Sequence, residues 1–333
     1  MLHSIIAKAP GCATSNPVAF DLPGFRQQLA TLAAKGVFLG TSSWKYPGWC
    51  GQIYERDRYI WRGRWSDSRF ERDCLSEYGQ VFKTVCVDAA YYNFPSRSYL
   101  EGLASQVPTD FLFSFKVTDH LTLKRFPNLP RFGARAGTEN HDFLNADLFA
   151  TGFLGTCEFI RPKVGMLLFE FSRFYASDFE RGREFVHVLD KFLSRLPGGW
   201  SYGVEIRNKQ FLHPDYFAML GRHKVAHVFN SWSGMPAMDE QIALPGSFTF
   251  PECFAARLLL KPGRKYEEAV KLFKPYDQIK EEYPEGRKAG AQLVKRALDS
   301  NGKTRAFIYV NNRFEGNALH TISAVLDSAS TSP

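Results

Sequence analysis

Residues 164–206 read VGMLLFEFSRFYASDFERGREFVHVLDKFLSRLPGGWSYGVEI, and this stretch decides the fold. It opens with the apolar run Val164–Phe169 and closes with the apolar run Tyr202–Ile206. Between them, Phe179–Leu196 places its large apolar residues on one face of a helix, and Pro197-Gly198-Gly199 ends that pattern. Continuous apolar runs are typical of strands buried on both faces of a parallel sheet. The stretch therefore predicts a strand–helix–strand unit of an α/β protein.

The same alternation continues along the whole chain. Further helix patterns cover Asp215–Leu220, Ala289–Leu298 and Ala318–Leu326. Eight strand–helix units in one chain indicate a closed (β/α)₈ barrel of the TIM type. An open, doubly wound sheet is the alternative, although no strand is followed by the glycine-rich dinucleotide turn. The six other strand runs are Val37–Gly40, Thr84–Val87, Phe111–Phe115, Ala226–Phe229, Ala255–Leu260 and Ala306–Val310.

The predicted barrel covers residues 36–328, after an N-terminal extension of residues 1–35 and before a disordered tail of residues 329–333. A helix over Phe25–Ala34 is expected to cap the barrel floor. Long insertions, Trp44–Arg72 and Val117–Phe143, follow the first and third strands. Both leave the C-terminal ends of strands, where barrel enzymes carry their sites, so we expect both to act as lids over that face.

Composition narrows the class of protein. Of 333 residues, 44% are hydrophobic and 15% aromatic, which excludes global disorder. No apolar run is long enough to cross a bilayer and no secretory signal is evident, so we expect no membrane partner and a cytoplasmic location. The six cysteines are scattered and are expected to be reduced, mostly buried thiols. The net charge of +8 permits a nucleic acid or another polyanion as partner.

Charged and amide side chains collect at the predicted C-terminal ends of the strands. Strand residues two apart share a face, so Glu205 and Arg207 point the same way, as do Cys86 and Asp88. Charges that reach a barrel interior must neutralise one another or face a ligand, because an isolated buried charge is costly. The collected residues are Asp88, Lys116, Glu170, Glu205, Arg207, Asn230, Arg257, Lys261, Asn311 and Asn312.

These residues predict an enzyme that binds a phosphorylated or otherwise anionic ligand. Arginine forks suit phosphate or carboxylate, and the turn Lys261-Pro-Gly-Arg264 with the segment from Asn311 offers a phosphate site. Asp88, Glu170 and Glu205 are the candidate catalytic carboxylates. They could instead be structural ion pairs that close the barrel top. No cofactor and no metal site is predicted, although a Mg²⁺-like ion on these oxygens stays open.

Aromatic side chains beyond the first two strands are candidate ligand contacts, namely Trp44, Tyr46 and Tyr92, or else parts of a packed lid. A non-catalytic barrel that binds nucleic acid through the basic stretch Arg56–Arg72 is the first alternative function. A carbohydrate-active hydrolase that uses Glu170 and Glu205 is the second, and the excess of cations disfavours it. No protein partner can be identified.

Several motifs resemble the DUF72 (YecE-like) family. They include Gly40-Thr-Ser-Ser-Trp44, the run from Thr84 to Pro95, Phe113-Ser-Phe-Lys116 and Val204-Glu-Ile-Arg207, and they occur in the family's order from Gly36 onward. The resemblance implies a TIM barrel of uncharacterised function. The chain departs from the family pattern at positions where the family commonly carries acids, histidines or glutamine. These departures are Cys86, Leu123, Glu170, Asn230 and Leu259.

Overall fold

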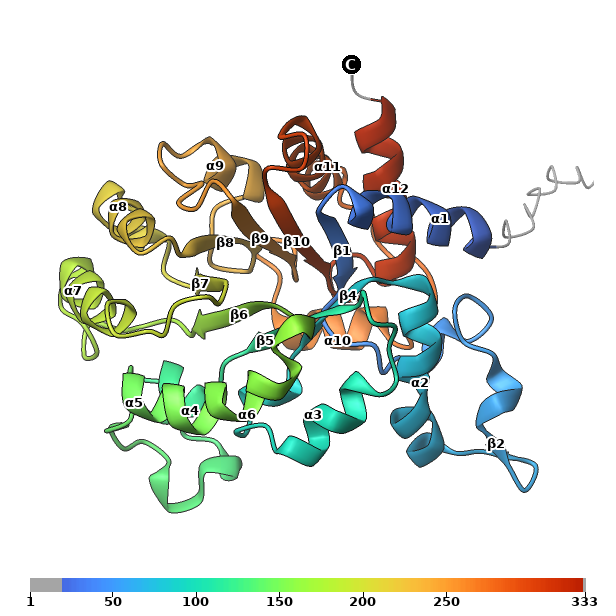
Figure 1. Ribbon diagram of the computed structural model, residues 1–333, viewed down its shortest axis with the longest axis horizontal. Coiled ribbons are helices and arrows are strands. Elements are labelled where there is room, and N and C mark those ends of the chain that lie inside the picture. The colour runs from blue at the N-terminus through green and yellow to red at the C-terminus, as the bar shows by residue number, and fades with distance from the viewer. Residues whose placement is uncertain (1–19, 332–333) are drawn as a thin grey trace, which may run out of the picture.

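Eight parallel strands form the centre of the protein, as a computed structural model that describes residues 20–331 shows (Figure 1). Neighbouring strands are hydrogen-bonded in the order β1-β10-β9-β8-β7-β6-β5-β4. The strands are β1 (Val37–Thr41), β4 (Thr84–Val87), β5 (Leu112–Lys116), β6 (Val164–Phe171), β7 (Tyr202–Ile206), β8 (Ala226–Ser231), β9 (Cys253–Leu258) and β10 (Arg305–Val310). Each predicted run corresponds to one of these strands.

The barrel is nearly closed where β1 meets β4. The two strands are joined by a single bridge between Ser42 and Cys86. Gly40 allows this approach, because a Cβ atom at that position would lie 2.4 Å from the backbone oxygen of Thr84. The closed-barrel prediction is confirmed, and the open doubly wound sheet is wrong.

Helices surround the sheet. The predicted helix over Phe179–Leu196 is shorter, because Phe179 packs in the preceding loop against the rings of Phe174 and Phe185. The helices are α1 (Leu22–Ala34), α2 (Asp67–Val81), α3 (Arg97–Ala104), α4 (Asp119–Thr122), α5 (Ala146–Leu148), α6 (Gly155–Cys157), α7 (Gly182–Leu193), α8 (Pro214–Arg222), α9 (Met238–Ala243), α10 (Tyr266–Phe273), α11 (Pro284–Asp299) and α12 (Ala318–Thr331).

The first and last described helices differ from expectation, whereas residues 1–19 of the predicted extension and 332–333 of the predicted tail lie outside the described residues. The ring of Phe25 packs on Phe82 at the end of α2, and Phe20 packs on His320 of α12. Helix α1 therefore belongs to the outer helical layer beside β1 (Figure 1) and does not cover the floor. Helix α12 continues to Thr331, so the predicted disordered tail is helical over residues 329–331.

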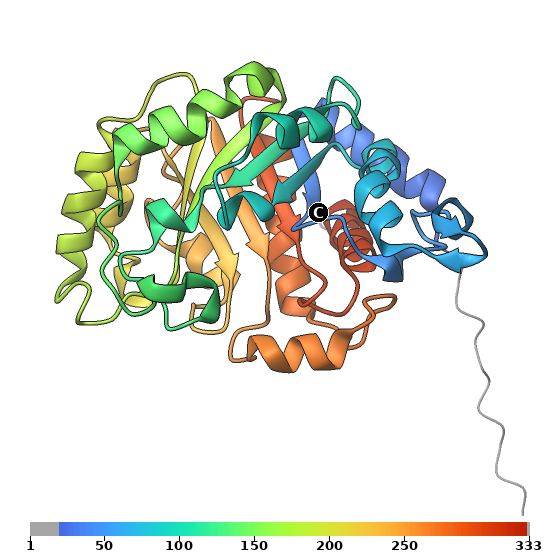
Figure 2. The same cartoon turned by 90° about the horizontal axis from the view of Figure 1, so that it is seen from below.

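Only one of the two insertions lies at the strand ends as expected. In Figure 2 the strands point downward, and α10 and the β5–β6 connection lie below their ends. The basic part of Trp44–Arg72 instead forms a hairpin, β2 (Ile60–Trp61) with β3 (Arg64–Trp65), at the side of the barrel. It is held there by Glu77 of α2, which accepts hydrogen bonds from the Glu55 N–H and the Tyr59 hydroxyl. The prediction that this part covers the strand ends is therefore wrong.

Two smaller expectations can also be compared with the structure. Cys50, Cys74, Cys86, Cys157 and Cys253 are free thiols, four of them buried, as predicted, while Cys12 lies outside the described residues. Among residues 20–331, no helix has the length and apolar character needed to cross a membrane.

Candidate functional site

The inner face of the barrel changes from apolar to polar toward the C-terminal ends of the strands. Met166, Leu168, Ala255, Phe307 and Tyr309 belong to an apolar cluster of buried residues in the barrel interior. Since alternate residues share a face, the next inward positions are polar on every strand. They are Ser42, Asp88, Lys116, Glu170, Glu205 with Arg207, Asn230, Arg257 and Asn311. The alternation read from the sequence thus places these side chains in one layer.

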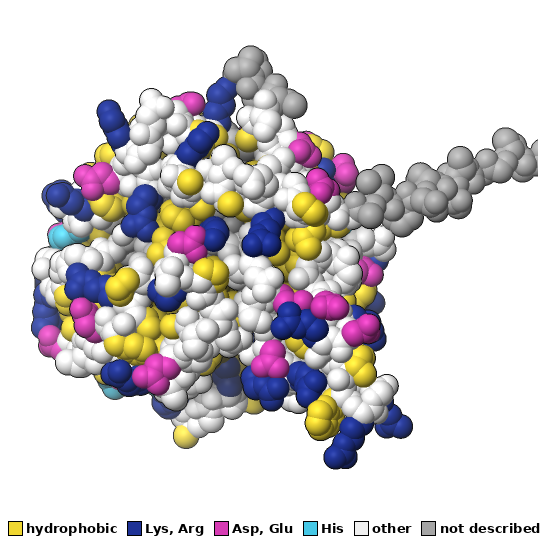
Figure 3. Space-filling model, turned by 45° about the vertical axis from the view of Figure 1, so that its right-hand side comes forward, with side chains coloured by type: hydrophobic (Ala, Val, Ile, Leu, Met, Phe, Trp, Pro, Cys, Tyr) yellow, Lys and Arg dark blue, Asp and Glu magenta, His cyan; other side chains and the backbone are white. Residues whose placement is uncertain are grey.

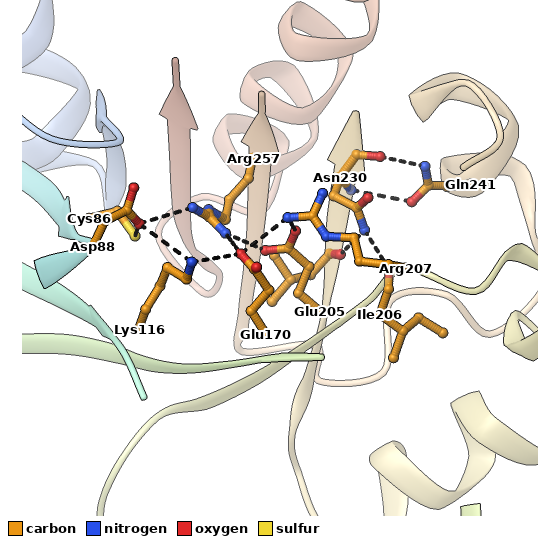
Figure 4. Close-up of polar contacts among 11 residues, drawn as sticks. Cys86, Asp88, Lys116, Glu170, Glu205, Ile206, Arg207, Asn230, Gln241 and Arg257 are labelled. Atoms are coloured by element: carbon orange, nitrogen blue, oxygen red, sulfur yellow. Dashed lines mark hydrogen bonds and ion pairs between the residues drawn. The ribbon is translucent and has the colours of Figure 1, made fainter. Parts of the chain in front are cut away.

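Arg257 is the centre of this layer (Figure 4). Its Nη1 lies 2.5 Å from Glu170 Oε2 and 2.7 Å from Glu205 Oε2, and its Nη2 lies 3.2 Å from Asp88 Oδ1. The side chain is only 2% exposed. One guanidinium from β9 therefore contacts all three predicted catalytic carboxylates, which come from three other strand ends.

Two further cations complete the network. Lys116 Nζ is 3.0 Å from Glu170 Oε2 and 4.0 Å from Asp88 Oδ1. Arg207 Nη2 is 3.1 Å from Glu170 Oε2 and 2.6 Å from Glu205 Oε1. Three cations and three carboxylates thus balance, so the network itself has no excess positive charge. The sequence interpretation had counted Lys261 in this set, and the structure places that residue elsewhere.

The electrostatics favour the charged forms of Glu170 and Lys116. Burial opposes ionisation of Glu170, but the charges of Lys116, Arg207 and Arg257 hold its pKa well below the usual value. Burial likewise opposes the charge of Lys116, yet Glu170 and Asp88 leave its pKa raised. Burial raises the pKa of the Cys86 thiol to about 12, so this residue is no thiolate nucleophile at neutral pH. Because its pKa is held low, Glu170 cannot serve as a general acid near neutral pH.

A metal ion does not fit among these carboxylates. Arg257 already occupies the space in which a cation would bind oxygens of Asp88, Glu170 and Glu205. Across residues 20–331, no group of three His, Cys, Asp or Glu side chains is arranged to hold a metal. The donor set favours ion pairing within the protein over Mg²⁺ coordination.

Several polar atoms of the inner layer are buried and lack a hydrogen-bond partner within the described protein. The donors are Arg207 Nη1, Arg257 Nε and Asn311 Nδ2, and the acceptors are Asn230 Oδ1 and Glu205 Oε1, the latter 2.6 Å from Arg207 Nη2 in an ion pair. The hydroxyl of Ser42, which can donate or accept, is also unpartnered. The other ends of both amides are fixed, since Asn311 Oδ1 accepts from the Arg313 N–H and Asn230 Nδ2 donates to the Ile206 oxygen. Buried polar groups normally have a partner, so a ligand or water with mainly acceptor atoms suits this layer.

The predicted phosphate turn after β9 lies outside the network. Lys261 Nζ is 3.3 Å from Glu281 Oε1, and Arg264 Nη2 is 2.6 Å from Glu281 Oε2. Two cations thus share one carboxylate, which leaves this turn with a net positive charge. Arg264 Nη1 is buried without a partner. The expected basic turn is present, and Glu281 is a partner that the local sequence did not identify.

Four other candidates have different surroundings. Asn312 Oδ1 accepts a hydrogen bond from the Ala318 N–H at 2.7 Å at the start of α12, while its Nδ2 is buried without a partner. Trp44 is buried, whereas Tyr46 is half-buried and packs against Trp49 with the two rings tilted by 49°. Tyr92 is exposed and lies under the guanidinium of Arg131 at 5.0 Å. Of these four candidates, Tyr92 is the exposed one, and Arg131 lies over its ring.

Two aromatic contacts of the network were not predicted as site residues. Lys116 Nζ lies 3.9 Å from the ring centre of Tyr91, the neighbour of the predicted Tyr92. Arg207 lies 4.1 Å from the ring centre of Trp232, which follows β8. Cation–π contacts of this kind stabilise a desolvated charge. The strand-end position of both aromatics is the sequence signal that would have identified them.

Two of the departures from the family pattern, Leu123 and Leu259, fall on packed apolar positions, whereas Glu170 and Asn230 belong to the inner polar layer. Leu123 packs with Phe126 and Phe132, and Leu259 packs with Phe273 and Tyr276. His227, which the sequence analysis did not include in the site, is on the outer face of β8 against Tyr216, with its pKa lowered by burial to about 3. The described site therefore contains no ionisable histidine among its inward residues.

A cavity of about 410 Å³ adjoins this layer between the β5–β6 and β6–β7 connections. Lys124, Arg125 and Arg173 line it together with Ser172, which is two residues beyond Glu170. The hydroxyl of Thr122, also in the lining, is buried without a partner. With three cations and one carboxylate, that of Asp178, in its lining, this cavity is basic and large enough for a small ligand.

Comparisons with known proteins agree with this architecture. A family model described as "Protein of unknown function DUF72" matches residues 38–332. The UPF0759 protein YecE of Escherichia coli K12 is 27% identical over 165 residues, 48% of this chain and 50% of YecE, so the chain spans about half the length of the curated relatives it matches. A DUF72 family protein of Enterococcus faecalis V583 has a TM-score of 0.57 at 18% identity and covers 89% of this chain and 96% of that chain. A DUF72 family protein of Thermotoga maritima MSB8 has a TM-score of 0.51 at 16% identity, covering 88% and 98%. The structural likenesses support the barrel fold.

Proposed function

This chain belongs to the DUF72 family, and we propose that it binds a phosphorylated or otherwise anionic ligand at the C-terminal ends of its strands. The family description supplies no activity, so the proposal rests on the chemistry of the inner layer. Cytoplasmic location and the absence of a cofactor remain predictions of the sequence.

The excess of unpartnered donors over acceptors in the inner layer carries this proposal. Arg207 Nη1, Arg257 Nε and Asn311 Nδ2 are unpartnered donors. Asn230 Oδ1 is an unpartnered acceptor, Glu205 Oε1 has only its ion pair with Arg207, and Ser42 Oγ can take either role. Phosphate and carboxylate oxygens only accept, and hydrogen bonds to charged acceptors are the stronger class. The net positive charge of the turn that carries Lys261 and Arg264 adds long-range attraction for the same ligand.

Asp88 is the carboxylate best placed to act on the ligand. Its side chain is 30% exposed, against 12% for Glu170 and 0% for Glu205. Glu170 and Glu205 hold the guanidinium of Arg257 and are positioning residues in this account. Asp88 would orient a ligand hydroxyl or move its proton, if the ligand reacts at all.

Glycoside hydrolysis is less well supported by the arrangement. That chemistry needs one protonated carboxyl group and one carboxylate, with a water or sugar between them. Here Arg257 Nη1 lies between Glu170 and Glu205 and contacts both. The low pKa of Glu170 also removes it as the proton donor.

Thermal shift with inorganic pyrophosphate, sugar phosphates and nucleoside monophosphates tests the proposal. A ligand at 100 times its Kd stabilises a protein by about 2.7 kcal/mol, which raises the Tm by several degrees. Asn311→Asp keeps the oxygen that accepts from Arg313 but replaces the free donor with a charged oxygen. We expect at least about tenfold weaker binding, because a charged hydrogen bond is worth roughly 1.5–3 kcal/mol.

Two further variants make the result interpretable. Asn301→Asp makes the same change on an exposed turn that precedes β10, at the opposite end of the barrel, and should leave affinity unchanged. Ser42→Ala removes an unpartnered hydroxyl at little structural cost and should weaken binding several-fold. Failure of every phosphorylated compound to raise the Tm, or equal affinity in Asn311→Asp and wild type, would contradict the proposal.

A further inference from the structure

The β2–β3 hairpin carries a surface that the proposed ligand site does not use. In the register of the hairpin, Trp61 pairs with Arg64 and Ile60 pairs with Trp65. Paired residues share one face of a two-stranded ribbon, so Trp61 and Arg64 lie on one side and Ile60 and Trp65 on the other. Trp61 is 54% exposed, whereas Trp65 is half-buried.

The inner face of the hairpin holds it in place. Trp65 packs against Tyr59 at a ring distance of 5.7 Å and against Phe70 of α2 at 5.3 Å. Its indole N–H donates to Asp67 Oδ1 at 2.7 Å. Trp61 contributes none of these contacts, so the exposed indole is not what holds the hairpin on the barrel.

Arginines surround the exposed indole. The guanidinium of Arg69 lies 4.6 Å from the ring centre of Trp61, and that of Arg62 lies 5.8 Å from it. Arg62, Arg64 and Arg69 have no carboxylate of the described residues within ion-pair distance. The stretch from Arg56 to Asp73 contains six arginines and four acidic residues. The hairpin thus combines a large π surface with uncompensated positive charge.

The tip of the hairpin retains arginine at an energetic cost. Arg62 and Gly63, the two turn residues, have φ values of 49° and 75°. A two-residue turn with both φ values positive normally carries Asn-Gly or Gly-Gly, and an arginine in that conformation is strained by about 1 kcal/mol. A contact between the Arg62 side chain and a ligand would account for an arginine at this strained position.

The charged surface continues from the hairpin onto the barrel. A groove of about 630 Å³ lies beside it, lined by Arg58, Arg69, Arg72 and Asp73 with Ser76, Ser105 and Gln106. Arg72 is paired with Asp73 and Arg58 with Glu77, so Arg69 is the arginine of this lining that has no ion pair among the described residues. Figure 3 shows Lys and Arg side chains gathered around hydrophobic ones at the lower right of the molecule, where the hairpin stands. A polar, arginine-lined groove next to one exposed indole can track a phosphate backbone while a base stacks on the ring.

We propose that the Trp61 surface, defined as Trp61, Arg62, Arg64 and Arg69 with the adjoining groove, binds single-stranded nucleic acid. Base–aromatic stacking with arginines on the phosphates is the usual chemistry of such sites. A duplex offers its base faces only at the ends, which makes it a poorer ligand for an indole. A membrane surface would need several apolar side chains, and the outer face of the hairpin has a single one.

Fluorescence anisotropy with a labelled 12-nucleotide oligo(dT), titrated across a salt series, tests this proposal. We expect affinity for the single strand to exceed that for a duplex of equal length and to fall as salt rises. Trp61→Ala should weaken binding about tenfold. The triple variant Arg62→Ala/Arg64→Ala/Arg69→Ala should weaken it more, and should reduce the salt slope by about 2, because each phosphate contact on a single strand contributes about 0.7.

A matched triple variant controls for overall charge. Arg183→Ala/Arg195→Ala/Arg222→Ala removes three exposed arginines near α7 and α8, on the opposite side of the barrel, and should bind within twofold of wild type. Asn311→Asp should also bind normally, which separates this surface from the ligand site at the strand ends. No oligonucleotide binding at low salt would overturn the proposal. Equal oligonucleotide binding by the wild type and both hairpin variants would also overturn the proposal. So would a protein that binds anionic phosphatidylserine vesicles but not the oligonucleotide.

Discussion

Replacement of Arg257 by Met measures how strongly the inner layer depends on one guanidinium. The side chain is 2% exposed and contacts Asp88, Glu170 and Glu205. Methionine has a similar length but leaves three carboxylates with only Lys116 and Arg207. Removing one partner of a buried ion pair costs about 3–5 kcal/mol, because a buried charge is left without compensation. At roughly 2–4 °C per kcal/mol for a protein of this size, the Tm should fall by about 10 °C.

The pH dependence of the stability loss in Arg257→Met identifies the carboxylates as the cause of that loss. In the wild type, the pKa of Glu170 is depressed below its unfolded value of about 4.3. Its ionised form therefore stabilises the fold above that pH, and the contribution is lost as the pH falls through the folded pKa. Without Arg257, burial still opposes ionisation of Glu170, and only Lys116 and Arg207 remain to favour its charged form. The difference in unfolding free energy between wild type and variant should consequently shrink as the pH falls below about 5.

Urea unfolding at pH 7.5 and 4.5 provides the measurement. Arg183→Met removes an arginine whose side chain is 83% exposed and whose pair with Asp215 is 3.3 Å long, and it should change stability by less than about 0.5 kcal/mol. The double variant Arg257→Met/Glu205→Gln should be more stable than Arg257→Met alone, since it removes a buried charge. A loss below about 1 kcal/mol for Arg257→Met, or a loss that is the same at both pH values, would refute this reasoning.

Two further predictions concern the barrel itself. Gly40→Ala should cost about 2–4 kcal/mol in urea unfolding, because its Cβ would lie 2.4 Å from the Thr84 oxygen and would force β1 away from β4. Gly102→Ala, with open space around its Cβ, should be neutral or stabilising. Similar stabilities of the two variants would argue against a tight β1–β4 contact. The pKa of His227 is lowered by burial to about 3, so between pH 6.5 and 4 the unfolded chain binds more protons than the folded one and stability falls as the pH falls. His227→Phe should flatten this decline. An unchanged slope of stability against pH would show that His227 is not its cause.

Local patterns accounted for much of the fold and for the composition of the inner layer. Strand alternation depends only on residues two apart, so Asp88, Lys116, Glu170 and Arg257 could be assigned to one face without knowledge of the barrel. The apolar runs located all eight strands for the same reason, because burial on both faces is visible in each run separately.

The pairings within that layer could not be predicted from the sequence. Arg257 of β9 reaches Asp88 and Glu170 across the barrel, so its contacts depend on barrel closure and not on chain neighbours. Glu281 neutralises part of the predicted phosphate turn from a segment 17 residues after Arg264. Because of such long-range partners, the expected excess of cations at the strand ends is instead a balanced network beside a positively charged turn.

The β2–β3 hairpin could be predicted from local sequence, but its placement on the barrel could not. The sequence Trp61-Arg-Gly-Arg-Trp65 contains a glycine at the second turn position of a two-residue hairpin, which is a local turn signal. What it could not give is the direction in which the hairpin leaves the barrel. That direction follows from the hydrogen bonds that Glu77 of α2 accepts from Glu55 and Tyr59.

The central claim is that the unpartnered donors of the inner layer bind an anion. Anomalous diffraction from crystals soaked in tungstate, a phosphate analogue whose metal scatters strongly, tests it most directly. We predict a tungsten peak placed so that the tungstate oxygens lie within hydrogen-bond distance of Asn311 Nδ2 and Arg207 Nη1, and its loss in Asn311→Asp crystals. Anomalous peaks confined to surface lysines and arginines, with none at the strand ends, would contradict the account.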